Sequence, residues 1–221
     1  MFPNLTTFAF QVAIYINSGK IMADELSVAC RKKMKMGSFT PTLLPDFPGM
    51  PDEIPRLQIQ TEAGFQLTMS PARIDLTLDL AFGIENSDEN LFFENFYLLL
   101  DVLDDFPVEY SRVGILRRFY HVMNNPELLL LKCFNGARSE GLSDFTVNGV
   151  YDANVSGLNC KDVYSVSSGV IRGAEPGLVA LRDLNVNPGQ GIINRVKVIN
   201  FVQSANALLT DESIAEFAGA R

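Results

Sequence analysis

The sequence predicts an α+β fold in which helices pack on one face of an antiparallel sheet, or of two joined sheets. Two observations carry this prediction. Segments of alternating apolar and polar residues, typical of strands with one buried face, precede longer segments with apolar residues at helical spacing. This order occurs twice, as three strands and a helix over residues 56–104 and again over residues 144–209.

A strand and a helix are predicted before the first of these units. FAFQVAIYI, residues 8–16, is short and rich in β-branched and aromatic residues, which favours a strand. KIMADELSVACRKKMKM, residues 20–36, favours a helix that Gly37 ends. One stripe of this helix carries Met22, Leu26, Ala29 and Lys33. Residues 40–55 contain five prolines, which predicts an ordered surface loop or a linker.

The first unit then consists of a hairpin, a third strand and the clearest helix of the chain. Alternation over residues 57–80 predicts the three strands. NSDENLFFENFYLLLDVLDDF, residues 86–106, predicts an amphipathic helix that Ser87 or Asp88 caps. Its buried stripe consists of Phe92, Phe96, Leu99 and Leu103.

The rest of the chain begins with EYSRVGILRRFYHVM, residues 109–123, which is predicted to be a strand. NPELLLLKCF, residues 125–134, fits either a short helix or a buried strand. Three strands follow within residues 144–187, and a last short helix is expected from Thr210 or Asp211 to Ala218. Before it, one helical stripe carries Val196, Ile199, Val202, Asn206 and Leu209.

We interpret the two units as a duplicated structural element of three strands and a helix. The expected organisation is one compact domain with two related lobes. The N-terminal α+β half comprises residues 1–124, and the C-terminal half comprises residues 125–221.

The composition restricts the partners and the location of the protein. The chain of 221 residues contains 18 Lys and Arg against 26 Asp and Glu, and the resulting net charge of −8 argues against general nucleic-acid binding. Its three cysteines form no CxxC pair, which favours reduced thiols. Neither a signal peptide nor an apolar run of about 20 residues occurs, so we expect a cytoplasmic protein without membrane association.

The motifs of common catalytic and metal sites are missing from the sequence. With His121 as its single histidine, the chain cannot form a zinc site with several imidazoles. Walker A, GxGxxG and GxSxG motifs do not occur. We therefore predict no catalytic residue, no metal site and no cofactor, and the sequence favours a protein that is not an enzyme.

Three arginines on the predicted strand of residues 109–123 are the main functional lead. Alternation places Arg112 and Arg118 on one face, and Arg117 on the other. One interpretation is a basic cleft that recognises a carboxylate or phosphate. Its ligand-binding candidates are Arg112, Arg117, Arg118, Tyr120, His121 and Asp183.

The other interpretation is a set of internal salt bridges, which the surplus of acidic residues favours. The expected carboxylate partners are Asp79, Asp101 and Asp183. Asp75 and Asp79 lie on one face of a predicted strand. Residues four apart in a strand are separated by about 13 Å, which is too far for the two carboxylates to share a metal ion. We therefore expect both side chains to be solvated.

Two segments carry a resemblance to a known family. SRVGILRRFYHVM resembles the RxGLRYxN-like strand of a sporadically distributed, uncharacterised family of bacterial proteins, and GLVALRDLNVN resembles that family's LLxDxD strand. Two extra residues interrupt the first motif, and its asparagine is shifted to Asn124 or Asn125. The resemblance implies a similar architecture and a role among accessory or host–virus conflict genes. It implies no catalytic residue, because the activity of the family is not established.

Three functions are consistent with these observations. The favoured one is a non-enzymatic protein-binding or regulatory protein, with antiviral defence as one setting, that forms a homo- or hetero-oligomer with itself or another protein. The alternative is a protein or enzyme that binds an anionic small molecule, such as a nucleotide, through the arginine strand. A nucleic-acid mimic ranks last, because the acidic residues are spread along the chain.

Overall fold

The computed structural model describes residues 2–80, 83–134, 144–171 and 175–219. Its strands are β1 (Thr6–Ser18), β2 (Thr42–Leu43), β3 (Leu57–Gln60), β4 (Phe65–Met69), β5 (Arg73–Asp79), β6 (Glu109–Val122), β7 (Thr146–Val155), β8 (Leu158–Ile171) and β9 (Glu175–Val186). Its helices are α1 (Ala23–Lys33), α2 (Asn86–Leu103), α3 (Pro126–Cys133), α4 (Arg195–Asn206) and α5 (Asp211–Phe217).

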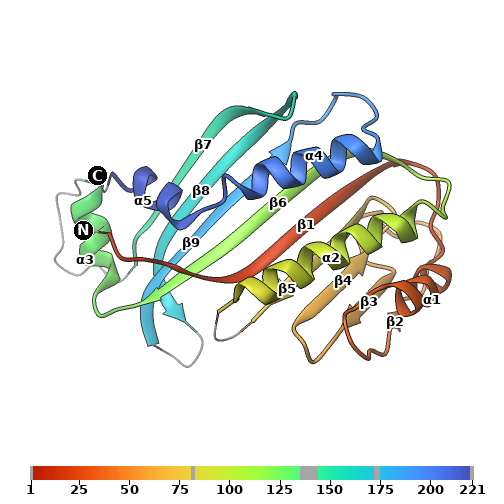
Figure 1. Cartoon of the computed structure of the whole chain (residues 1–221), viewed down its shortest axis with the longest axis horizontal. Helices are drawn as coiled ribbons and strands as arrows, with labels where there is room; N and C mark the ends of the chain where they lie inside the picture. The colour runs from red at the N-terminus through yellow and green to blue at the C-terminus, as the bar shows by residue number, and fades with distance from the viewer. Residues whose placement is uncertain (1, 81–82, 135–143, 172–174, 220–221) are drawn as a thin grey trace.

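The nine strands of the described residues form one antiparallel sheet, in the order β2-β3-β4-β5-β1-β6-β9-β8-β7. Helices α1, α2 and α4 cross one face of this sheet (Figure 1). On that face β1 buries Phe10, Val12 and Ile14. Residues of α3 and α5 pack with β6, β8 and β9 in a second apolar cluster at the end of the same face. The predicted α+β class, with helices on one face, is confirmed.

The order of elements repeats around the centre of the sheet. The first half runs β1–α1–β3–β4–β5–α2, apart from the short β2, and the second runs β6–α3–β7–β8–β9–α4. Because β1 and β6 pair with each other, the strand order outward from the centre is the same in both halves. Each predicted unit of three strands and a helix is therefore preceded by a strand and a helix. The sheet is continuous across the boundary predicted at residue 124, because β6 pairs with both β1 and β9.

A polar belt divides the apolar interior beneath the helices. Arg117 on β6 lies opposite Arg182 on β9. Arg182 forms a buried ion pair with Asp162 on β8, with 2.7 Å between Nη2 and Oδ2, and donates a hydrogen bond to the Leu208 carbonyl. The larger apolar cluster fills the space under α1, α2 and α4, and the smaller one lies under α3 and α5.

The helix predicted over residues 86–106 is observed as α2, which ends three residues earlier, at Leu103, and differs in its N-cap. Its predicted stripe is buried throughout. Glu85 is the N-cap, in place of Ser87 or Asp88, and forms a capping box with Asp88 as the third helical residue. Residues 126–133 form α3, so the helical alternative for that segment is the one observed. Thr210 caps α5, as predicted.

Two predicted helical stripes are correct only in part. Leu26, Val202 and Leu209 are buried, and Ala29 and Ile199 pack against the core. In α1 the buried residues are Leu26, Ser27 and Cys30, and Met22 lies at the N-cap with its side chain exposed. In α4 the buried residues are Val198, Phe201, Val202 and Ala205, whereas Val196 is exposed. Both helices have only about three turns. In so short a helix the apolar residues are compatible with more than one choice of buried stripe. The packing partner then selects the buried one.

Candidate functional site

The face of the sheet opposite the helices carries a group of polar side chains at its centre. Phe10, Val12 and Ile14 point toward the helices, so Gln11 and Tyr15 point to the open face. The same alternation places polar residues of β5, β6 and β9 beside them. We call this group the central polar cluster, and it consists of Gln11, Tyr15, Arg73, Asp75, Arg112, Asp183 and Asn185.

Small residues make room for the side chains of this cluster. Ala13 on β1 lies opposite Asp75 on β5 and Gly114 on β6, and Gly114 lies opposite Asn185 on β9. A Cβ atom on Gly114 would lie 1.9 Å from the Asn185 Oδ1 atom. Asn185 can therefore lie across β6, where its Nδ2 donates a hydrogen bond of 2.5 Å to Asp183 Oδ1.

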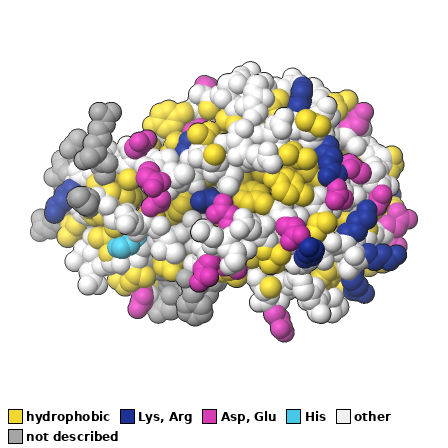
Figure 2. Space-filling model, in the orientation of Figure 1, with side chains coloured by type: hydrophobic (Ala, Val, Ile, Leu, Met, Phe, Trp, Pro, Cys, Tyr) yellow, Lys and Arg dark blue, Asp and Glu magenta, His cyan; other side chains and the backbone are white. Residues whose placement is uncertain are grey.

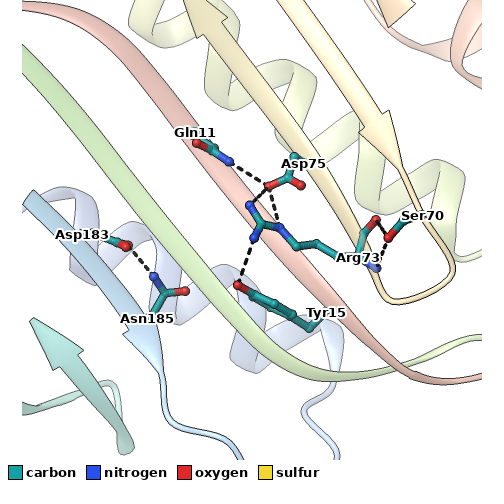
Figure 3. Close-up of polar contacts among 7 residues, drawn as sticks. All are labelled: Gln11, Tyr15, Ser70, Arg73, Asp75, Asp183 and Asn185. Carbon is teal, nitrogen blue, oxygen red and sulfur yellow. Dashed lines mark hydrogen bonds and ion pairs between the residues drawn. The ribbon is translucent and has the colours of Figure 1, made fainter. Parts of the chain in front are cut away.

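Arg73 links β5 to β1 within the cluster. Its Nε and Nη2 atoms donate to Asp75 Oδ1 at 2.9 and 2.5 Å, and its Nη1 donates to the Tyr15 hydroxyl at 3.3 Å (Figure 3). Gln11 Nε2 donates to the same Asp75 oxygen at 2.8 Å. The expectation that Asp75 is solvated is wrong, because these neighbours leave its side chain only 17% exposed.

Arg112 is a cation without a carboxylate partner among the described residues. Its guanidinium carbon lies 4.0 Å from the centre of the Tyr15 ring, and that of Arg73 lies over the same ring at 5.2 Å. The Nε atom of Arg112 is buried without a hydrogen-bond partner in the described chain. Such a donor is costly to leave unsatisfied, and because it is buried, only the terminal N–H groups of this guanidinium group are available to an oxygen from outside the chain.

Asp183 lies on the same face and titrates near neutral pH. Burial raises the pKa of its carboxyl group to about 6. The hydrogen bond from Asn185 and the positive charges of Arg73 and Arg118 offset part of this rise. The carboxyl group is therefore ionised at pH 7 and becomes neutral in mildly acidic solution.

The sheet separates the residues that the sequence proposed as one binding site. Arg112, Arg118, Tyr120 and Asp183 belong to the open face, whereas Arg117 and His121 belong to the helix face. The predicted residues are therefore not brought together in one cleft.

Arg117 is held inside the protein. Its Nη2 atom donates to Glu89 Oε1 on α2 at 2.8 Å and to Asn206 Oδ1 on α4 at 3.1 Å. Its guanidinium group also lies over the Phe10 ring, at 4.3 Å. The predicted internal salt bridge thus exists for Arg117, but its partner is Glu89 and not Asp101 or Asp183. Asp101 instead pairs with Arg195.

Sequence reasoning missed the residues that other strands bring to the cluster. Gln11, Tyr15, Arg73 and Asn185 were not proposed as site residues. A signal for two of them was present, because Gln11 and Tyr15 interrupt the apolar strand FAFQVAIYI at positions four apart. The signal could not be used without knowing that β1 lies between β5 and β6.

Only a small pocket lies beside the cluster in the described part of the chain. The pocket beside it has a volume of about 220 Å³, and its lining includes Tyr15, Arg73 and Asp75. A larger pocket of about 620 Å³ lies elsewhere, between the start of α1 and the proline-rich loop. The buried Arg56 of that pocket is bound to Asp46 and to the Ile54 carbonyl, so it holds the loop in place.

Within the described chain, no three His, Cys, Asp or Glu side chains are grouped so as to hold a metal ion. Comparison with known proteins found no family model that matches the chain and no curated protein with significant sequence similarity. The resemblance to the bacterial family stays a prediction.

Proposed function

We propose that the protein binds another protein through the open face of its sheet and is not an enzyme. The observation that carries this proposal is the position of Arg112 and Arg118. Both lie on the open face of β6, and neither forms an ion pair with a described carboxylate. Six residues of extended strand place them about 20 Å apart, so a small anion could contact only one of them, whereas a protein surface could contact both.

The chemistry of the face indicates what the partner presents. Guanidinium groups recognise carboxylates through paired N–H donors, and arginine and tyrosine are among the side chains enriched at the centres of protein interfaces. The partner surface would therefore carry Asp or Glu side chains that reach Arg112 and Arg118. Figure 2 shows the opposite, helix-covered side, where acidic side chains are scattered among apolar and basic ones and form no continuous array. This distribution gives no support to nucleic-acid mimicry.

The proposal is tested by replacing each arginine separately with alanine. Partners are first identified by pull-down and mass spectrometry from the native host, and one purified partner is then titrated calorimetrically. Arg112→Ala and Arg118→Ala should each weaken binding about tenfold or more, since a hydrogen bond to a charged group contributes about 1.5–3 kcal/mol. Their melting temperatures should stay close to that of the wild type.

Arg117→Ala is the matched comparison, because it removes an arginine from the same strand but from the other face. It should lower the melting temperature, since it removes a buried guanidinium group and leaves Glu89 with only the hydrogen bond from Asn206. Unchanged binding by both Arg112→Ala and Arg118→Ala would refute the proposal.

A second candidate is an anionic small molecule bound beside Tyr15. The pocket lined by Tyr15 and Arg73 favours it, and the guanidinium group of Arg112 lies over the same Tyr15 ring. In this case inorganic phosphate or a nucleotide would raise the melting temperature of the wild type and not that of Arg112→Ala.

We propose a cytoplasmic location because Cys30, Cys133 and Cys160 are free thiols. None of the helices in the described chain has the length and apolar character to cross a membrane. A role in a conflict or defence system rests on the family resemblance alone.

A further inference from the structure

The outer edge of β7 offers unpaired backbone groups to a partner. β7 is the last strand of the sheet, and no described strand lies beyond it (Figure 1). It is ten residues long and pairs with β8 without a register shift. Ser156 and Gly157 join the two strands with positive φ angles of 51° and 80°, as in a type I′ turn.

The register shows which backbone groups of β7 point outward. The Phe145 carbonyl accepts a hydrogen bond of 2.8 Å from the Ser168 N–H. Along an antiparallel pair, residues whose backbone groups bond to the neighbouring strand alternate with residues whose backbone groups point away from it. The odd-numbered residues of β7 therefore bond to β8. The N–H and C=O groups of the even-numbered residues therefore point away from the sheet. These residues are Thr146, Asn148, Val150, Asp152 and Asn154, and the side chains of all five are exposed.

The two edges of the sheet differ in their protection against pairing. Natural edge strands are blunted by short length, proline, lysine or bulges. β2, at the other edge, has only two residues and is preceded by Pro41. β7 contains no proline, lysine or bulge, and it exposes Val150 and Tyr151 by 60% and 53%.

We propose that β7 pairs antiparallel with β7 of a second copy of this chain, with the two-fold axis at Val150. This register is self-complementary. Val150 faces Val150 of the second copy, and Asn148 faces Asp152, where an amide donor meets a carboxylate acceptor. Tyr151 faces Gly149, whose position beside the strand is covered by the rings of Phe217 and Tyr151 of its own chain, so this pair is an aromatic contact. All outward backbone groups from residue 146 to residue 154 find partners.

The register with its axis at Asp152, on the same edge, is less favourable. An axis at Asp152 would place two carboxylates directly opposite each other, and like charges in such positions destabilise a sheet. The axis at Val150 also produces a continuous sheet across both copies. Because this axis is perpendicular to the sheet, both open faces lie on the same side. The dimer is independent of the partner binding proposed above, since it uses a different edge and different residues.

Sedimentation velocity of the purified chain at micromolar concentrations tests the dimer and its register. The wild type should be a dimer. Asn148→Asp should weaken the dimer roughly tenfold. The new carboxylate of each copy would face Asp152 of the other copy, so each dimer would contain two such repulsive pairs. Adding Asp152→Asn to this variant should restore the wild-type affinity, since the carboxylate and the amide then exchange places.

Val150→Lys should give a folded monomer, because two lysines would meet at the axis. Its melting temperature should not depend on protein concentration, whereas that of the dimeric wild type should. Leu43→Lys, on the exposed apolar residue of the opposite edge strand, is the matched control and should stay a dimer. A monomeric wild type, a dimeric Val150→Lys variant, or no recovery in the double variant would overturn the proposal.

Discussion

Arg117 and Arg118 are neighbours in the sequence, and the pleat of β6 gives them opposite environments. Arg117 enters the helix side, where Glu89 and Asn206 bind it. Arg118 lies on the open face and forms no ion pair with a described carboxylate. The same side-chain chemistry therefore serves internal structure at one position and is available for binding at the next.

Asp183 makes stability depend on pH in a predictable direction. Its pKa in the folded protein, about 6, lies above the usual value of about 4 for the unfolded chain. The folded protein therefore holds the proton more tightly, and this contribution to stability is complete below pH 4 and is lost as the pH rises through 6. Asp183→Asn removes this loss of stability at higher pH, because the asparagine side chain does not ionise.

Urea unfolding of Asp183→Asn and of the wild type at pH 4 and pH 7 measures this effect. The free energy of unfolding of the variant, relative to the wild type, should increase by on the order of 2 kcal/mol between the two pH values. A relative stability that stays constant or decreases would show that Asp183 is not buried as described.

At the scale of elements, β6 and β9 fit together through one pair of residues. Gly114 has no side chain, and Asn185 occupies the space that one would fill. Asn185 in turn binds Asp183, so the pairing of the two strands positions the carboxylate of the open face. The glycine is thus a requirement of packing between strands and not of a turn.

The fit between Gly114 and Asn185 predicts a coupled pair of mutations. Gly114→Ala should destabilise the wild type by about 1–2 kcal/mol, because the new methyl group displaces the Asn185 side chain. In an Asn185→Ala background it should be neutral or stabilising, since alanine is favoured over glycine in a strand. Urea unfolding of the four proteins gives the coupling free energy.

Gly169→Ala on β8 is the control for this cycle. The nearest atom to a Cβ at that position is 4.0 Å away, so the methyl group is accommodated and stability should not fall. An equal cost of Gly114→Ala in both backgrounds would contradict the proposed contact.

At the scale of the whole molecule, the two halves share one sheet and one main core. The larger apolar cluster contains Phe96 of α2 together with Phe201 of α4, and it includes residues of β1 and β6. The smaller cluster, under α3 and α5, is joined to it by β6, β8 and β9, which run through both. Elements that share strands in this way are expected to unfold together.

Differential scanning calorimetry should therefore show a single unfolding transition. Phe96→Leu and Phe201→Leu, one in each half, should each lower its midpoint by roughly 2–4 °C, as expected for a loss of about 1 kcal/mol in a chain of this length. Two transitions, each shifted by only one of the substitutions, would instead indicate that the halves unfold separately.

The sequence by itself determined the class of the fold, the position of most strands and the face on which each residue of β6 lies. These properties depend on the alternation of side chains along one strand, which is local and has a period of two. Only the tertiary structure decided that β1 lies between β5 and β6, that Glu89 is the partner of Arg117, and that Tyr15 and Arg73 lie beside Arg112. Those contacts join residues far apart in the chain, and no local pattern specifies which strands become neighbours.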